Sequence, residues 1–181
     1  MKITIFPFII CFTAVTGIFA QQNDNQSDSV KVIKEFRNLY QYQQFYLSGQ
    51  PTYEALQWLK SKGVKKIINL RTEKENGEFA ATAFNEEYMA TLMGLEYHSL
   101  PVDALKDYTP AKLDSLASLL RSEDITLIHC LGASRATHFF MAWLVKYRDY
   151  SVDRAVAIGK QITFYLPLEN LLGVEILMET R

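Results

Sequence analysis

The stretch "ITLIHCLGASRATHFFMAWLVKY", residues 125–147, decides the fold of this chain. It opens with a short apolar run, 125–129, which is typical of a buried strand bounded by a turn. From residue 135 onward the segment is apolar nearly all round, which predicts a helix in the centre of the domain. A six-residue turn from Cys130 to Arg135 joins the two. The segment therefore predicts a buried strand, a tight loop and a buried helix.

The remainder of the chain alternates in the same way. Short runs rich in branched residues predict strands near 44–47, 64–70 and 95–102. Capping residues, apolar periodicity and closing glycines predict helices between them. These helices open at Pro51, extend from about 78 to 93, open at Thr109–Pro110 and Ser151, and close the chain over 166–180. We expect an α/β domain with a mostly parallel central sheet flanked by helices.

The N-terminus predicts export. Residues 1–20, "MKITIFPFIICFTAVTGIFA", have the early lysine, apolar run and small residues near a cleavage point that characterise a signal peptide. An uncleaved membrane anchor is the alternative. Residues 21–32 are expected to be a flexible leader and 33–181 a single domain. Cleavage would leave a periplasmic or secreted protein without a stable membrane anchor.

Composition and charge argue against some classes of ligand. The net charge is −1 and no basic patch is evident, which argues against a nucleic-acid partner. Three scattered histidines and two cysteines offer no metal-ligand spacing, so we expect neither a metal nor another cofactor. Removal of the signal peptide takes Cys11 with it and leaves Cys130 as the single thiol. Such a thiol in an oxidising compartment is either buried and inert or kept for its chemistry.

The position of Cys130 favours chemistry. Ligands of open α/β sheets bind beyond the carboxyl ends of strands, where loop N–H groups and a helix dipole converge. The loop is expected to form an anion-sized nest from the backbone of Leu131, Gly132, Ala133 and Ser134. The positive potential there favours a thiolate, and Arg135 can hold two oxygens of a tetrahedral anion. Thiolate, nest and guanidinium together describe covalent phosphoryl transfer.

A proton donor is also needed for the leaving group. The loop "PVDALKDYTP", residues 101–110, follows the preceding strand and carries Asp103 and Asp107. We assign the general-acid role to Asp103, with Asp107 as the second choice. The alternative for both is an exposed loop aspartate.

These segments, taken together, resemble the cysteine-based protein tyrosine and dual-specificity phosphatase superfamily. More narrowly, the chain is similar to the bacterial branch described as beta-lactamase-hydrolase-like phosphatases. The resemblance covers about residues 33–162 and rests on the order of five segments: "YLSGQP" (46–51), "LKSKGVKKIINLR" (59–71), "GLEYHSLPVD" (94–103), "HCLGASR" (129–135) and "SVDRAVAIGKQ" (151–161).

The resemblance implies roles for individual residues. Cys130 would be the nucleophile, Arg135 the phosphate clamp and Asp103 the general acid. Around them, the resemblance implies supporting residues that orient the loop or line and brace the pocket: His129, Thr137, Ser48, Gln50 and Arg71. The alternative for Arg71 is a surface ion pair. The expected reaction is hydrolysis of a phosphomonoester through a phosphocysteine intermediate. The substrate would be a phosphorylated small molecule or protein, with phosphotyrosine as one candidate.

The loop departs from the superfamily's usual pattern in two ways. Four residues separate Cys130 from Arg135 instead of five, and Gly132 stands second after the cysteine instead of third. Ala136 occupies the position where a serine or threonine usually stabilises the departing thiolate. Thr137 follows one step later and Ser134 stands one step before the arginine. We therefore expect slow breakdown of the phosphocysteine.

Two other functions remain open. A rhodanese-like sulfurtransferase would carry a persulfide on Cys130, and "INLRTEKE" (68–75) echoes a segment of that fold. However, the glycine–histidine–isoleucine stretch of rhodaneses is absent. The second alternative is a non-catalytic domain that binds phosphorylated ligands.

Overall fold

A computed structural model of the chain describes residues 28–163 and 168–174, except for the side chains of 104 and 105. The predicted signal peptide, 1–20, lies outside the described residues, as does the leader up to residue 27. No helix in the described part is long and apolar enough to cross a membrane.

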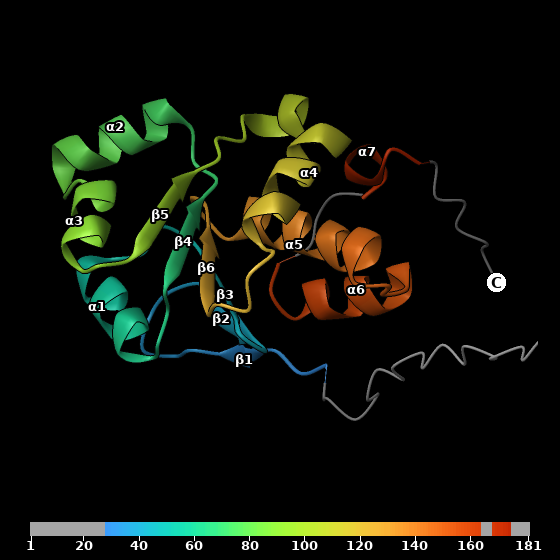
Figure 1. Cartoon of the computed structure of the whole chain (residues 1–181), viewed down its shortest axis with the longest axis horizontal. Coiled ribbons are helices and arrows are strands. Elements are labelled where there is room, and N and C mark those ends of the chain that lie inside the picture. Colours follow the sequence, from blue (N-terminus) through green and yellow to red (C-terminus); the bar gives the residue numbers. More distant parts are fainter. Residues whose placement is uncertain (1–27, 164–167, 175–181) are drawn as a thin grey trace, which may run out of the picture.

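A six-stranded sheet forms the centre of the domain, in the order β1-β2-β3-β6-β4-β5 (Figure 1). The strands β3, β6, β4 and β5 are parallel to one another, whereas β2 pairs antiparallel with β3 and β1 pairs antiparallel with β2. This confirms the predicted mostly parallel α/β fold. The strands are β1 (Lys31–Val32), β2 (Leu39–Tyr42), β3 (Phe45–Ser48), β4 (Lys66–Asn69), β5 (Glu96–Ser99) and β6 (Thr126–His129).

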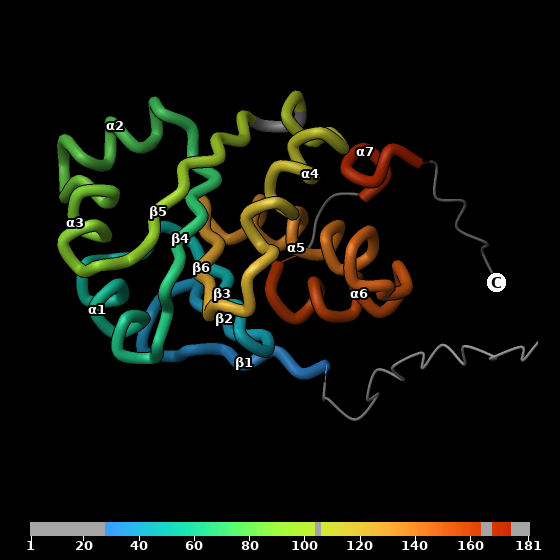
Figure 2. Tube along the Cα trace, viewed as in Figure 1, coloured from blue at the N-terminus to red at the C-terminus, as the bar shows by residue number. Residues whose placement is uncertain are grey.

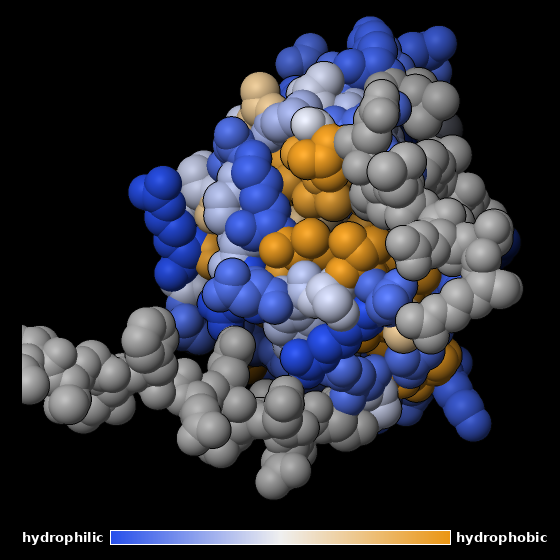
Figure 3. Space-filling model, turned by 90° about the vertical axis from the view of Figure 1, so that its right-hand side faces the viewer, coloured by the Kyte–Doolittle hydropathy of each residue, from blue (hydrophilic) through white to orange (hydrophobic). Residues whose placement is uncertain are grey.

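Helices cover both faces of the sheet. In Figures 1 and 2, α1, α2 and α3 lie on one side, and α4, α5, α6 and α7 lie on the other. Figure 3 looks onto the end of the molecule that carries α6 and α7, where apolar side chains gather between polar borders. The bounds are α1 (Tyr53–Ser61), α2 (Glu73–Thr82), α3 (Glu86–Leu92), the 3₁₀ helix η1 (Ala104–Asp107), α4 (Pro110–Leu119), α5 (Ser134–Tyr147), α6 (Val152–Lys160) and α7 (Glu169–Leu172).

Alternation along the strands divides the interior into two cores. Ile67 and Leu127 are register partners on one face, where they pack in one cluster with Leu56 and Leu59 of α1. Their sequence neighbours Ile68 and Ile128 point to the other face, in a larger cluster with α4 to α7. Because successive side chains of a strand face opposite ways, the central strands β4 and β6 are buried on both sides, whereas the edge strand β5 is partly exposed. This explains why the predicted strand at 125–129 is mostly apolar and does not alternate with polar residues.

The predicted helix over about 78–93 is wrong. The structure has two helices there, separated at residues 83–85. The first begins earlier because Thr72 and Glu75 form a capping box, in which each side chain accepts a hydrogen bond from the other residue's backbone N–H. The second begins where the Asn85 side chain accepts from the N–H of Tyr88. The earlier start brings Glu75 into the first turn of α2.

The sheet also begins earlier than the predicted domain boundary. Residues 31 and 32, placed in the leader, form β1 and pair with β2. Just before them, the Asp28 carboxylate accepts hydrogen bonds from Arg154 at 2.7 and 3.0 Å and from the Tyr42 hydroxyl at 2.9 Å. This end of the described chain therefore lies against α6 (Figure 2).

Candidate active site

The loop from Cys130 to Arg135 is joined to the segment that follows β3. The Cys130 N–H donates to the Ser48 carbonyl at 3.2 Å, and the Gln50 N–H donates to the Leu131 carbonyl at 3.1 Å. Between them, Gly49 and Gly132 form a β-bridge. A Cβ on Gly49 would lie 2.9 Å from the Leu131 carbonyl oxygen, so this approach requires glycine. The "SGQP" motif thus serves as a backbone support for the loop.

The sharp turn of the loop falls at Ala133. This residue has a φ of 73°, in the left-handed region that costs a residue with a side chain about 1 kcal/mol. It stands third after Cys130, the position where the usual signature has glycine. A Cβ on Gly132 would meet nothing within 4 Å, so no close contact requires glycine there. The shorter loop therefore keeps the turn at the third position and builds it with alanine.

Ala133 also precedes the first residue of α5 and has no side-chain acceptor to cap the helix. The first N–H groups of a helix lack partners within the helix, and the helix dipole adds positive potential there. Thr137 donates its hydroxyl to the Ala133 carbonyl at 2.9 Å, which holds the turn from inside. The N-terminus of α5 is thus open to an anion at the end of the loop.

Cys130 lies at the end of β6 with 1% of its surface exposed. Tyr108 is its buried neighbour from the loop before α4. Burial chiefly, together with the charge of Cys130, raises the pKa of Tyr108 to about 12, although Arg135 opposes this rise. The Tyr108 phenol is therefore protonated at neutral pH. The sequence interpretation did not include Tyr108. Its one signal in the sequence is that it lies in the same loop as Asp103 and Asp107.

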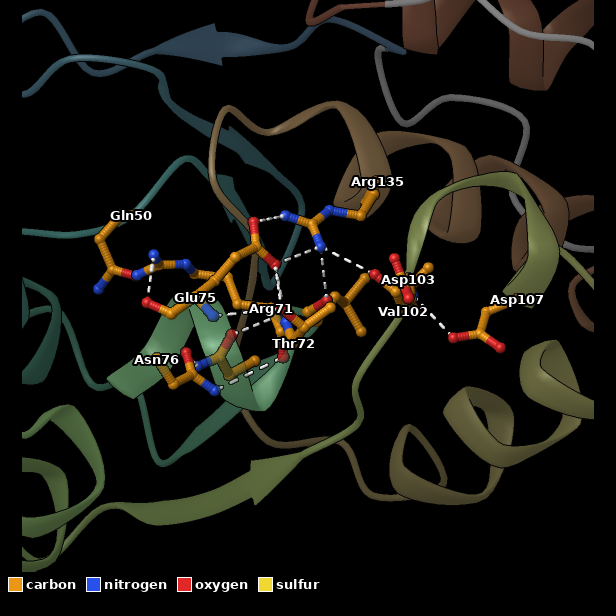
Figure 4. A network of polar contacts seen from close by, with 11 residues as sticks. Gln50, Arg71, Thr72, Glu75, Asn76, Val102, Asp103, Asp107 and Arg135 are labelled. Atoms are coloured by element: carbon orange, nitrogen blue, oxygen red, sulfur yellow. Dashed lines mark hydrogen bonds and ion pairs between the residues drawn. The ribbon is translucent and has the colours of Figure 1, made fainter. Parts of the chain in front are cut away.

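Arg135 is held in one orientation by three groups (Figure 4). Its Nη1 and Nη2 donate to the two carboxylate oxygens of Glu75 at 2.8 and 2.6 Å. Nη1 also donates to the carbonyls of Val102 at 2.8 Å and Leu70 at 3.3 Å. Nε and one Nη2 hydrogen take no part in these bonds. Such a bidentate contact fixes the plane of the guanidinium, which leaves its remaining N–H groups as a pre-aligned donor pair.

The charges of this pair reinforce each other. The hydrogen bond from Arg135 chiefly, with help from Thr72 and against burial, lowers the pKa of Glu75 to about 2. Burial alone would lower the pKa of Arg135, but the bonds to Glu75 and the charge of Cys130 outweigh it and raise that pKa. Cys130 and Arg135 are therefore electrostatically coupled across the loop. Glu75 was missed in the sequence interpretation, although "TEKE" (72–75) carries the signal of a capping box.

A second set of contacts starts from His129, the residue before the nucleophile. Its imidazole is fully buried, and its Nε2 lies 3.0 Å from a carboxylate oxygen of Glu86. This is ion-pair distance, and neither ring nitrogen of His129 has a hydrogen-bond partner among the described residues. Burial alone would raise the pKa of Glu86, but His129, Gln50 and Arg71 outweigh burial and lower it. Glu86 is therefore a buried carboxylate behind the loop, which the sequence interpretation did not identify.

Gln50 and Arg71 connect these two sets. The amide of Gln50 donates to Glu86 at 2.9 Å and accepts from Arg71. Arg71 in turn donates to the Glu75 carbonyl at 2.7 Å (Figure 4). We call this series of contacting residues the loop network; it consists of His129, Glu86, Gln50, Arg71 and Glu75. Its residues come from four segments of the chain, and it links both ends of the loop, from His129 to Arg135, through side chains and the backbone carbonyl of Glu75.

The two candidate acids have different surroundings. The Asp107 carboxylate accepts from the Asp103 N–H at 2.7 Å, so it orders the loop (Figure 4). The Asp103 carboxylate is half exposed and forms an ion pair with Lys106 on the surface. Asp103 directly follows Val102, whose carbonyl accepts from Arg135. Asp103 therefore lies beside the arginine end of the loop with its carboxylate on the solvent side.

Ser48 lies behind the loop and does not face it with its hydroxyl. The Ser48 hydroxyl donates to the Gly49 carbonyl at 2.7 Å. The backbone carbonyl of Ser48 accepts from the Cys130 N–H. Within the described residues, no three histidine, cysteine, aspartate or glutamate side chains gather where they could hold a metal ion. The chemistry of the site thus depends on its thiol, its guanidinium, its backbone N–H groups and the nearby carboxylates.

Comparisons with known proteins bear on the family and the fold of the chain. Residues 18–164 match the family model described as "DSP-PTPase phosphatase fused to NAD+ Kinase". No curated protein sequence matches the chain. Among solved structures, TpbA of P. aeruginosa in complex with phosphotyrosine is 17% identical with a TM-score of 0.57, covering 72% of this chain and 76% of that one.

The core catalytic domain of the PP-IP phosphatase SIW14 from S. cerevisiae is similar to the same degree. It is also 17% identical with a TM-score of 0.57, covering 71% of this chain and 76% of that one. At such identity the likeness concerns the fold. The narrower bacterial branch named from the sequence stays a prediction. Since the family model spans most of the chain, the protein belongs to the DSP-PTPase phosphatase family, within the cysteine-based protein tyrosine and dual-specificity phosphatase superfamily.

Proposed function

We propose that the protein hydrolyses phosphomonoesters through a phosphocysteine intermediate on Cys130. One observation carries the proposal: Glu75 aligns Arg135 beside Cys130 at the uncapped start of α5. A guanidinium and helix N–H groups that converge next to a thiol match the charge of a phosphoryl group in transfer. A cysteine without an anion site would need none of these contacts.

The first step transfers the phosphoryl group to sulfur. The Cys130 thiolate attacks phosphorus, an S–P bond forms, and the bond from phosphorus to the ester oxygen breaks. The equatorial oxygens face the N–H groups of the loop and the donors of Arg135 that Glu75 does not use. Asp103, in its protonated form, gives its proton to the departing oxygen.

The second step returns the enzyme to its starting state. Water attacks phosphorus, Asp103 accepts a proton from it, and the S–P bond breaks to give inorganic phosphate and the thiolate. Ala136 offers no hydroxyl for this thiolate, and the Thr137 hydroxyl is engaged by the Ala133 carbonyl. We therefore expect the second step to limit the rate.

The substrate and the location belong to the same proposal. TpbA is described with bound phosphotyrosine and SIW14 as a PP-IP phosphatase, which supports a phosphorylated substrate of small-molecule or protein origin. Phosphotyrosine is a candidate within this class. The sequence of residues 1–20 supports a periplasmic or secreted protein, and cell fractionation of a tagged chain tests that point.

The test compares three activities of the purified protein. With p-nitrophenyl phosphate, rapid mixing should show a burst of about one nitrophenolate per protein, followed by slower steady turnover. Cys130→Ser should abolish both, because serine is a far weaker nucleophile. Thiocyanate formation from thiosulfate and cyanide would instead support the rhodanese-like alternative. Binding of inorganic phosphate without any turnover would support the non-catalytic domain.

A further inference from the structure

A pocket of about 480 Å³ adjoins the loop on the side of β3. Leu131 and Gly132 belong both to the loop and to this pocket, and Leu131 is more than half exposed. The opposite walls come from the turn before β2 and from the segment that leads into α1. The lining residues are Phe36, Arg37, Asn38, Leu39, Ser48, Gly49, Gln50, Pro51, Thr52, Ala55, Leu131 and Gly132.

The wall next to the loop keeps its shape through backbone contacts. The Gln50 N–H bonds the Leu131 carbonyl, and the Gly49–Gly132 bridge lies beside it. A phosphoryl group on the loop N–H groups would therefore have this pocket as a neighbouring, pre-formed surface. Pre-formed walls bind a ligand without the cost of ordering them first.

The chemistry of the lining selects a type of ligand. Apolar side chains form much of it, among them Phe36, Leu39 and Leu131. Among the described residues that line it, Arg37 is the one charged side chain and none carries a carboxylate. A second pocket, between α2 and α3, has an acidic lining instead, with Glu73, Glu86 and Glu87 in its walls. An apolar pocket with a single cation fits an organic anion.

Arg37 is available for such a ligand. It is exposed, and it forms no ion pair or hydrogen bond with residues 28–163 or 168–174. Its position is set by the turn at Asn38, whose φ of 53° lies in the left-handed region, and by the bond from the Gly49 N–H to the Asn38 carbonyl at 3.0 Å. Thr52 and Ala55, at the start of α1, line the same pocket.

We propose that this pocket binds the organic part of the substrate and that Arg37 binds a second anionic group on it. The proposal rests on the proposed function and narrows its substrate class. The substrate would be a phosphomonoester whose organic part carries another phosphate or a carboxylate. An uncharged aryl phosphate would use the loop without the contact to Arg37.

Three probes with one aryl body test this proposal: phenyl phosphate, 4-(carboxymethyl)phenyl phosphate and 1,4-phenylene bisphosphate. The measurement is kcat/KM for each anionic probe divided by that for phenyl phosphate. Arg37→Gln should lower this ratio about tenfold, mainly through KM, since a charge-assisted contact of this kind contributes on that order. The probe that responds more identifies the second group as a phosphate or a carboxylate.

Arg121→Gln is the matched control. Arg121 is likewise exposed and unpaired among the described residues, but it lines a different pocket, beside α4 and α5. Its substitution should leave the ratio unchanged. Equal ratios for the parent and Arg37→Gln would overturn the proposal for Arg37 while hydrolysis by Cys130 stands. Thermal unfolding of each variant verifies that it is folded.

If the protein shows no turnover, a measurement of binding still tests the pocket separately from the proposed hydrolysis. Calorimetric titration of 1,4-phenylene bisphosphate into Cys130→Ser, with and without Arg37→Gln, measures the pocket directly. A weaker affinity in the double variant, without turnover in the parent, would support the pocket and reject the proposed hydrolysis. An affinity that does not depend on Arg37 would reject the pocket's role in binding the second anion.

Discussion

The two sides of the loop at Cys130 are built in contrasting ways. On the arginine side, the side chains of Arg135 and Glu75 are 15% and 23% exposed and are joined by two short hydrogen bonds. On the acid side, the side chains of Asp103 and Lys106 are 53% and 69% exposed. Solvent and salt weaken an exposed pair far more than a half-buried one.

The contrast teaches how the two tasks of the site differ. Binding a phosphoryl group requires donors that are aligned before the ligand arrives, which the loop network supplies from behind. Protonating a leaving group requires a carboxyl that can exchange its proton with water, which an exposed loop allows. The following variants test this division, beginning with the largest expected effect.

Replacement of Arg135, the residue assigned to bind the phosphate oxygens, should lower the activity most. Arg135→Lys should lower kcat/KM for p-nitrophenyl phosphate by about a thousandfold, because a point charge cannot form the bidentate contact with Glu75 and hold phosphate oxygens as well. Steady-state kinetics gives the value. Arg148→Lys is the control, because Arg148 directly follows α5 at the end of the helix remote from the loop, where it is half-buried against Trp143. Full activity of Arg135→Lys would show that the arginine side is not the anion site.

The far end of the loop network should matter for folding. Glu86→Gln removes the buried anion that faces His129 and Arg71, and loss of one partner of a buried pair costs about 3 kcal/mol of the free energy of unfolding. Urea denaturation at neutral pH measures this loss. The neighbouring Glu87 is exposed, so Glu87→Gln should change little. Equal effects at both positions would mean that the network does not stabilise the loop.

The acid side should respond to the leaving group. Asp103→Asn should lower turnover of a simple alkyl phosphate by about a hundredfold, because a proton donor contributes on that order. It should affect p-nitrophenyl phosphate far less, since nitrophenolate departs without a proton. Asp107→Asn, which weakens the bond from the Asp103 N–H because a neutral amide oxygen replaces the carboxylate, should slow both substrates alike. If Asp107→Asn shows the leaving-group dependence instead, Asp107 is the acid.

The ion pair on the arginine side should give a modest dependence of stability on pH. The pKa of Glu75 is about 2, below the ordinary value near 4.3, so the pair stabilises the folded state fully above pH 5. This contribution is lost as the pH falls from about 4.3 towards 2. The stability difference between the parent and Glu75→Gln should therefore be constant above pH 5 and shrink below it.

Chemical denaturation from pH 7 to pH 3 measures this difference. Glu73→Gln serves as the control, because Glu73 is an exposed carboxylate in the same helical turn. A difference that persists unchanged down to pH 3 would mean that the Glu75 pair is not formed in solution.

Much of the fold could be predicted from the sequence because its signals are local. The apolar run of β6, the all-round apolar helix α5 and the capping residues Thr109 and Ser151 each depend on neighbouring residues alone. The failure at 78–93 has a local cause too. The capping residues Thr72 and Asn85 outweigh an apolar periodicity that continues across the break.

The sequence by itself determined that Cys130 and Arg135 occupy the two ends of one short loop between a buried strand and a buried helix. Their separation of five positions leaves them no other arrangement once the strand and helix form. It also determined the family, because the order of the motifs is a property of the chain.

Tertiary structure alone decided which carboxylates serve the loop. Glu75 lies 60 positions from Arg135, and Glu86 lies 43 positions from His129, so no local pattern relates them. They meet because the parallel strands β4 and β6 are adjacent, which brings the segments after both strands to the same edge of the sheet. Burial at that edge makes an unpaired charge costly, and both carboxylates lie against cationic or polar partners there, Glu75 against Arg135 and Glu86 against His129 and Gln50.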